Sequence, residues 1–191
     1  MTDLDPIPSD KRQAIEMRLA EIEERHGVKI LLAVESGSRA WGFPSADSDY
    51  DVRFIYVRSL VSYLSFKQPR DAIEQPIKEL LDISGWDVRK AVGLALRSNA
   101  TVGEWLTSPI VYRCDVRACG LLLDFVHANF SPRHYALHYL SFAEKQWRPH
   151  ARTSTVKSKR YCYAMRTLLA LCWTEVHEAE GSELVAAQVA M

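Results

Sequence analysis

GSRAWGFPSADSDYDVRFIYV, residues 37–57, is the segment from which the rest of the chain can be placed. Its second half predicts a β-strand, because β-branched and aromatic residues follow a turn rich in proline, serine and aspartate. Side chains alternate along a strand, so Asp49 and Asp51 share one face, with Cα atoms about 6.5 Å apart, and Tyr50 faces the core. Two ionised carboxylates at this spacing repel each other unless a cation such as Mg²⁺ lies between them. The pair therefore predicts a site for one or two hard divalent cations.

A Gly-Ser turn precedes this strand. Gly37 and Ser38 follow an apolar run at residues 30–34, and a short helix is predicted to begin at Arg39. Free backbone N–H groups from Gly37 to Arg39, together with the Ser38 hydroxyl, can bind an anion, so these three residues are the predicted phosphate-binding residues of the turn. The sequence thus predicts a phosphate-binding turn next to the metal site.

The two features together resemble the signature of a known superfamily. Gly37-Ser38 followed by DSDYDV at residues 47–52 is similar to the motif of the DNA polymerase β-type nucleotidyltransferases. The longer sequence around this motif resembles that of one branch of the superfamily, the predicted nucleotidyltransferases described as the RNA repair pathway DNA polymerase beta family. The resembling segments are residues 35–57, 81–90, 98–112 and 157–173. The resemblance implies transfer of a nucleoside monophosphate from an NTP, with two Mg²⁺ ions, or Mn²⁺, held by Asp49 and Asp51.

The resemblance also implies a third catalytic, metal-binding carboxylate from a later strand. We assign it to Asp87, which ends the predicted strand LDISGWD and lies in a Gly-Trp-Asp segment similar to that of the branch. Asp82, which has the opposite parity on the same strand, is the alternative, and the residues alone do not separate the two. Asp87 could also act only as a helix N-cap, a position that aspartate fills well.

Unbalanced positive charge marks the C-terminal part of the chain. Seven basic residues and no acidic residue lie from Lys145 to Arg166. Positive charge facing the cleft would neutralise a triphosphate or an RNA backbone. By resemblance, Lys157 or Lys159 would hold the β- and γ-phosphates, and Tyr161 would lie near the nucleotide. A solvated basic helix face is the alternative.

The remaining sequence predicts an α+β fold, namely a polymerase β-like nucleotidyltransferase sheet with helices, plus a C-terminal helical region. Asp10 and Gln13 suit a capping box for the first helix, and Gly27 is its stop signal. Besides the strand that ends at residue 57, strands are expected at residues 28–34, 71–74, 76–81 and 81–88. Helices are expected at residues 10–26, within 58–66, and at 89–97, 116–129, 132–148 and 156–176.

We expect these elements to form a mostly antiparallel sheet with helices on one side. Residues 1–112 would be the nucleotidyltransferase catalytic domain, and residues 113–191 a helical region that completes the nucleotide cleft. Between them, Glu104 is expected to pair with a basic side chain, and Trp105 to belong to the core.

Composition narrows the class of protein. The chain has 191 residues, 48% of them hydrophobic, and a net charge of zero, so any nucleic-acid contact must come from a local patch. With no stretch long enough to span a bilayer and no signal-peptide pattern, we expect a cytoplasmic protein without a membrane partner. Members of the resembled branch continue past the last helix, so residues 178–191 are expected to be a frayed end or a truncation.

Reduced core thiols are predicted for the four cysteines, which lie in apolar surroundings without a Cys-x-x-Cys pair: Cys114, Cys119, Cys162 and Cys172.

These features predict a metal-dependent nucleotidyltransferase, with an RNA end as the expected acceptor. One alternative is a nucleotide- or RNA-binding module without turnover. A degenerate copy has little reason to keep a repulsive pair such as Asp49 and Asp51, which argues against that alternative. Another alternative is a protein-modifying (AMPylating) toxin–antitoxin partner, which would use the same chemistry on a different acceptor. The sequence leaves the NTP preference, the acceptor and the oligomeric state open.

Overall fold

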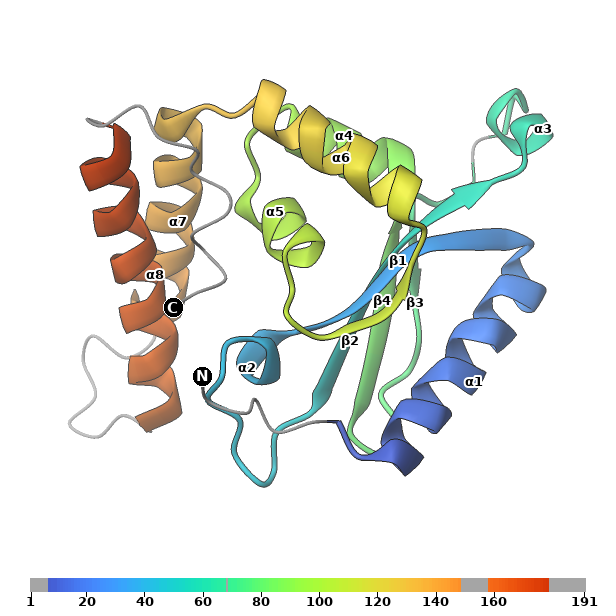
Figure 1. The fold of residues 1–191 in the computed structure, drawn as a ribbon, viewed down its shortest axis with the longest axis horizontal. Helices are drawn as coiled ribbons and strands as arrows, with labels where there is room; N and C mark the ends of the chain where they lie inside the picture. Colours follow the sequence, from blue (N-terminus) through green and yellow to red (C-terminus); the bar gives the residue numbers. More distant parts are fainter. Residues whose placement is uncertain (1–6, 68, 149–157, 179–191) are drawn as a thin grey trace.

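A five-stranded sheet forms the centre of the fold. The computed structural model describes residues 7–67, 69–148 and 158–178, and Figure 1 shows the sheet with helices packed around it. The strand order is β3-β4-β2-β1-β5. The strands are β1 (Val28–Ser36), β2 (Tyr50–Arg58), β3 (Ala72–Glu74), β4 (Leu81–Asp87) and β5 (Val111–Cys114). β2 and β4 run parallel and the other neighbours antiparallel, so the predicted α+β class is confirmed, with a mixed sheet.

Helices cover both faces of the sheet, so the prediction of helices on one side is wrong. On one face lies α1 (Ser9–His26), which buries Ile15, Leu19 and Ile22 against the sheet. The other face carries α4 (Val88–Ala95), α5 (Ala100–Leu106) and α6 (Val116–Ala128) (Figure 1). Because the central strands carry apolar side chains on both faces, each face needs a covering layer.

The two ends of α1 follow different signals. α1 begins after Pro8 without a side-chain cap, and Asp10 lies inside its first turn, so the predicted capping box is wrong. Proline suits this entry because it has no N–H to leave unpaired. Gly27 ends the helix with a φ of 59°, a left-handed conformation that glycine adopts without strain, as predicted.

The segment before β4 differs from its prediction. Residues 76–80 form a loop and not a strand, with a tight turn at Glu79 and Leu80, both at positive φ, and a single β-bridge from Lys78 to Leu81. Pro76 explains part of this, because proline cannot donate to a strand ladder. β3 pairs instead with the later half of β4, where Ala72 lies opposite Trp86. The short helices are α2 (Gly37–Ala40) and α3 (Leu60–Tyr63), the latter inside its predicted range.

Two long helices, α7 (Pro132–Trp147) and α8 (Ser158–Glu178), pack side by side next to the sheet (Figure 1). Tyr135, Tyr139 and Ala170 bring them against the start of α5 in a small apolar cluster. Even α8, with 21 residues, is not apolar enough to cross a membrane, and the same holds for every other helix in the described ranges.

α5 connects this helix pair to the sheet. Glu104 accepts a hydrogen bond from Arg166 of α8 at 2.8 Å, which confirms the expected basic partner. Trp105 is 3% exposed and stacks on Trp86 of β4 at a centroid distance of 4.0 Å, which confirms its place in the core.

The domain boundary predicted between residues 112 and 113 falls within one strand of the sheet. β5 spans both positions, and α6 packs on the sheet through Leu122. The helices that stand beside the sheet therefore begin at α7.

The four cysteines are free thiols, but the prediction that they are core residues is wrong for three of them. Cys114, Cys162 and Cys172 are exposed, and Cys119 is half-buried. Cys114 donates its S–H group to the sulfur of Cys119 at 3.0 Å. The apolar neighbours in sequence misled the prediction for the three exposed cysteines, whereas Cys119 packs against the apolar cluster under α4, α5 and α6.

Candidate nucleotide and metal site

A tight turn joins β1 to α2 and presses the backbone against Asp51. Gly37 has a φ of 63°, and a Cβ atom added there would overlap Oδ2 of Asp51. Glycine is therefore required for the left-handed backbone and for the close approach. Ser38, the next residue, is only 2% exposed. The predicted phosphate-binding turn and the predicted carboxylate strand are in contact.

The carboxylate pair lies at the start of β2. The Asp51 side chain is 25% exposed, and Asp49 is exposed just before the strand. Burial raises the pKa of the Asp51 carboxyl, and the charges of Asp82 and Asp49 raise it further. The nearby guanidinium of Arg53 opposes this rise. The ionised form of Asp51 is thus costly in isolation and favoured by any neighbouring positive charge.

β4 brings Asp82, and not Asp87, beside Asp51. The parallel ladder pairs Asp51 with Asp82 and Tyr56 with Asp87, so the two β4 aspartates lie at opposite ends of the strand. Asp87 is completely buried and caps α4 by accepting the N–H of Arg89 at 2.9 Å. The structure therefore does not bring the assigned third carboxylate to the site and places the alternative there. The prediction failed because the register between β2 and β4 decides which β4 residue lies next to Asp51, and that register cannot be read from the sequence.

Arg53 lies between the two adjacent carboxylates. Its Nη2 atom is 3.1 Å from Oδ1 of Asp51 and 2.6 Å from Oδ2 of Asp82. Its Nη1 atom donates to the carbonyl oxygens of Asp82 at 2.8 Å and of Val52 at 3.1 Å. Arg53 was not predicted as a site residue from the sequence, although strand alternation places it on the same face as Asp51.

Glu35 is a buried acid that the sequence analysis also missed. It is 0% exposed, and its Oε1 atom accepts the backbone N–H of Asp51 at 2.9 Å. Its Oε2 atom accepts the hydroxyl of Tyr112 at 2.7 Å. Burial raises the pKa of Glu35 to about 7, and the two hydrogen bonds limit the rise. A single acidic residue at the end of the apolar run 30–34 was the available signal.

A serine cluster joins the loop before β2 to α8. Ser48 is 1% exposed, and its Oγ atom lies 3.3 Å from Oγ of Ser38 and 2.9 Å from Oγ of Ser45. Lys159 donates to the same oxygen at 3.0 Å, so the structure brings this predicted residue to the Gly-Ser turn. Arg39 donates to the Ser48 carbonyl at 2.9 Å and holds the loop.

Aromatic side chains lie on the α8 side of the turn. The ring of Tyr163 meets Trp41 edge to face at 5.2 Å and Phe43 at 5.7 Å. Burial raises the pKa of Tyr163, the negative charge of Asp51 adds to the rise, and a hydrogen bond with Ser38 opposes it. Tyr163 is therefore the α8 tyrosine that contacts the site.

Tyr161, the tyrosine assigned from sequence, lies elsewhere. It is 48% exposed and packs near Trp147 at 5.9 Å. Lys159 and Tyr163 stand four residues apart and share a helix face, which is the same spacing as the predicted pair Lys157 and Tyr161. Lys157 lies outside the described residues. The four-residue spacing predicts which residues share a face of α8. It does not predict which face of the helix turns toward the site.

The donor set suits a hard divalent cation. Asp49, Asp51 and Asp82 offer carboxylate oxygens, the ligands that Mg²⁺ and Mn²⁺ prefer. The cost of burying the charge of Asp51 also favours a bound cation. Within the described ranges, however, no three acidic, histidine or cysteine side chains are gathered closely enough to hold an ion. The acids are near one another, and Arg53 stands where two of them would converge.

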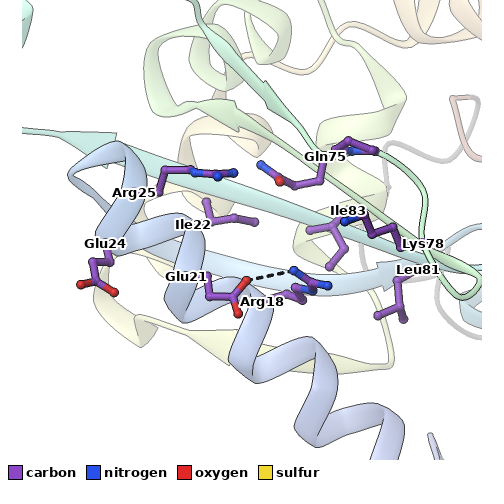
Figure 2. Close-up of a pocket in the computed structure, with 10 residues that line it drawn as sticks. Arg18, Glu21, Ile22, Glu24, Arg25, Gln75, Lys78, Leu81 and Ile83 are labelled. Carbon is purple, nitrogen blue, oxygen red and sulfur yellow. Dashed lines mark hydrogen bonds and ion pairs between the residues drawn. The ribbon is translucent and has the colours of Figure 1, made fainter.

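A separate pocket of about 420 Å³ lies between α1 and the residues leading into β4 (Figure 2). Arg18 of α1 and Lys78 of the loop line it together with Leu81 and Ile83. These two β4 side chains point to the opposite face of the strand from Asp82. The sheet therefore separates this pocket from the carboxylates.

Comparison with known proteins gives two findings. Residues 11–187 match the model of the RNA repair pathway DNA polymerase beta family. The chain is also 47% identical over 166 residues to the uncharacterized protein YcgL of Bacillus subtilis (strain 168). That alignment covers 87% of this chain and 64% of the length of YcgL, so the chain spans less than two thirds of that relative.

Proposed function

We propose that this chain, which belongs to the RNA repair pathway DNA polymerase beta family, transfers a nucleoside monophosphate from an NTP to an acceptor hydroxyl at an RNA end. The family is the one that the sequence resembles. The observation that supports this proposal most strongly is that three separate elements meet at Ser48. These are the Gly-Ser turn with Ser38, the loop that leads to the two aspartates, and α8 with Lys159.

The groups around Ser48 suit the phosphates of an NTP. Ser38 and Ser48 supply hydroxyls, and the turn at Gly37 supplies backbone N–H groups. Lys159 donates to a neutral hydroxyl, and no carboxylate of the described residues lies within ion-pair distance of it. Its charge is thus available to neutralise a phosphate oxygen.

The acids would hold the cation, with Asp82 taking the third position in place of Asp87. Mg²⁺ or Mn²⁺, when bound to Asp49 and Asp51, would supply Lewis-acid stabilisation of the charge that develops on the phosphates. Glu35 holds the backbone of Asp51, and Ser38 and Lys159 would orient the triphosphate so that the acceptor hydroxyl approaches the α-phosphorus in line.

An RNA acceptor is supported by the description of the family and by exposed basic side chains. Lys145 lies in the last turn of α7, Arg148 directly follows that helix, and Arg160 lies in the first turn of α8. The end of α7 and the start of α8 lie at the same end of the helix pair (Figure 1). A phosphate backbone would bind to such residues in a salt-dependent manner. Arg166 of the same basic segment does not contribute, because it pairs with Glu104.

The test is transfer of label. The chain is incubated with each NTP labelled at the α-phosphate, with Mg²⁺ or Mn²⁺ and a mixed pool of small RNAs, beside the double variant Asp49→Ala/Asp51→Ala. Label in RNA with the unmodified chain alone is the expected result. Label on protein instead would overturn the RNA acceptor in favour of AMPylation, and NTP binding without transfer would overturn the enzyme in favour of a binding module.

A further inference from the structure

The two carboxylate oxygens of Asp51 face different partners. Oδ2 lies beside Gly37, so close that a Cβ on that residue would overlap it. Oδ1 lies 3.1 Å from Nη2 of Arg53, and the same nitrogen is 2.6 Å from Oδ2 of Asp82. One oxygen therefore faces the phosphate-binding turn, and the other is held in an arginine bridge.

Arg53 is well held in this position. Its other terminal nitrogen donates to two carbonyl oxygens, those of Asp82 and Val52. Its side chain is 18% exposed, so solvent screens its attraction for the carboxylates less than it would at an open surface. Asp51 and Asp82 are direct neighbours in the parallel ladder, where they would repel each other without a positive charge between them.

We propose that Arg53 is the exchangeable counter-cation of this acidic site, so that a divalent cation can bridge Asp51 and Asp82 only after the guanidinium has released Asp51. This inference rests on the proposed function, which requires divalent cations here. A guanidinium does not lose its charge, so the position between the two carboxylates holds either Arg53 or a metal ion.

The arrangement makes two cation positions unequal. Asp49 and Asp51 would hold a first cation with Arg53 in place, because only one oxygen of Asp51 is paired with Arg53. The second position needs Asp82 and Oδ1 of Asp51, both of which Arg53 occupies. The exchange also accounts for the lack of a preformed three-acid cluster in the described residues.

Binding of Mn²⁺ alone tests the exchange, with the free ion followed by electron paramagnetic resonance and no nucleotide present. The unmodified chain is expected to bind one Mn²⁺ and a second, weaker one. Arg53→Gln removes the charge, and its second ion should bind at least about tenfold more tightly. Asp82→Asn should lose the second ion and keep the first. Identical isotherms for Arg53→Gln and the unmodified chain would overturn the proposal.

Arg89→Gln is the matched control. Arg89 also pairs with an aspartate of β4, Asp87 at 3.4 Å, but at the opposite end of the strand. The same substitution there should leave both Mn²⁺ affinities unchanged. A tighter second ion in this control as well would show a general effect of net charge and would overturn the specific role of Arg53.

Thermal unfolding keeps the test valid if Arg53→Gln folds poorly. Without metal, Arg53→Gln should melt at a lower temperature than the unmodified chain, because Asp51 and Asp82 then repel each other. Mn²⁺ should raise the melting temperature of this variant by more than it raises that of the unmodified chain. Arg53→Lys keeps a charge without the planar fork that bridges two carboxylates, and should give an intermediate second affinity. A larger Mn²⁺ shift in the unmodified chain than in either variant would overturn the exchange.

These readouts are separate from catalysis. If no NTP, acceptor and metal combination gives transfer but the Mn²⁺ series behaves as expected, the proposed function fails and the exchange stands. If transfer occurs and the isotherms are identical, the exchange fails and the proposed function stands.

Discussion

Glu35 accepts the backbone N–H of Asp51 at 2.9 Å, so a fully buried carboxylate fixes the position of a partly exposed one on the neighbouring strand. The second oxygen of Glu35 is held by the hydroxyl of Tyr112 on β5. Three strands, β1, β2 and β5, are thus tied together at the end of the sheet where the site lies. The connection links the protonation of a core residue to the geometry of the site.

Stability should fall as the pH rises through the pKa of Glu35. That pKa is about 7, above its ordinary value of 4.5, so the native state keeps a proton that the unfolded chain has lost. The resulting stabilisation is complete below the ordinary value and is lost as the pH rises to the native one. We expect the free energy of unfolding to drop by up to about 3 kcal/mol over this range, measured by urea denaturation.

Glu35→Gln is the control for this pH dependence. Glutamine keeps an acceptor for the Asp51 N–H but does not titrate, so the difference in unfolding free energy between the two proteins should change sign or shrink across the same range. If the difference in unfolding free energy between the unmodified chain and Glu35→Gln is the same at all pH values, Glu35 does not titrate between its ordinary pKa and about 7.

Asp82 and Asp87 should separate into a site role and a structural role. Asp82→Asn is expected to lower nucleotidyl transfer and leave the melting temperature nearly unchanged. Asp87→Ala removes the cap of α4 and the buried partner of Arg58 and Arg89, and should destabilise the fold by about 2–4 kcal/mol.

Melting curves and transfer assays on both variants check this division. Full transfer by Asp82→Asn together with normal stability of Asp87→Ala would reverse the two assignments and favour the original prediction from sequence.

Removal of Asp49 or Asp51 should abolish activity without unfolding the chain. Asp49→Ala and Asp51→Ala are each expected to reduce transfer by at least about 10³-fold. The stability should stay within about 1 kcal/mol, because Arg53 retains Asp82 as a partner and a desolvated charge is removed from position 51. Label transfer and chemical denaturation measure the two effects, and undiminished transfer in both variants would contradict the site.

Lys159→Met should weaken NTP binding more than it slows the chemical step. The ammonium lies at Ser48, where it would neutralise a terminal phosphate, and its loss should raise KM for the NTP by about tenfold. Lys145→Met, which removes an exposed charge that we assign to the RNA acceptor and not to the NTP, is the matched control and should leave KM for the NTP unchanged. Equal effects of the two substitutions would indicate a general field of positive charge in place of a specific contact.

The parts of this site that lie close together in sequence could be predicted from it. Gly37, Ser38, Asp49 and Asp51 form a local motif, and the turn and the carboxylate strand that it predicted are in contact through Gly37 and Asp51. Asp49 lies just before β2, so the predicted strand alternation does not extend to it. Tertiary neighbours could not be predicted in the same way. Asp82 reaches Asp51 only through the parallel β2–β4 register, which is set by packing across the whole sheet.

A similar limit applies to α8 and to the core. The basic segment and the four-residue spacing predicted a lysine and a tyrosine on one helix face, but the docking of α8 through Arg166 and Glu104 decides that the pair is Lys159 and Tyr163. Glu35 escaped notice because an acid at a strand end is ordinarily solvated. Its burial depends on Tyr112, a residue distant in sequence.

The contact between Gly37 and Oδ2 of Asp51 has an evolutionary consequence. The carboxylate fills the volume that any side chain at position 37 would need, so the two positions are epistatic. A library that samples one position at a time will find position 37 intolerant. Shortening Asp51 first removes the steric overlap at position 37, but a larger residue there still carries the cost of the left-handed backbone. Such a background lacks the carboxylate that we propose binds the metal, so selection for the proposed transfer would close that mutational route.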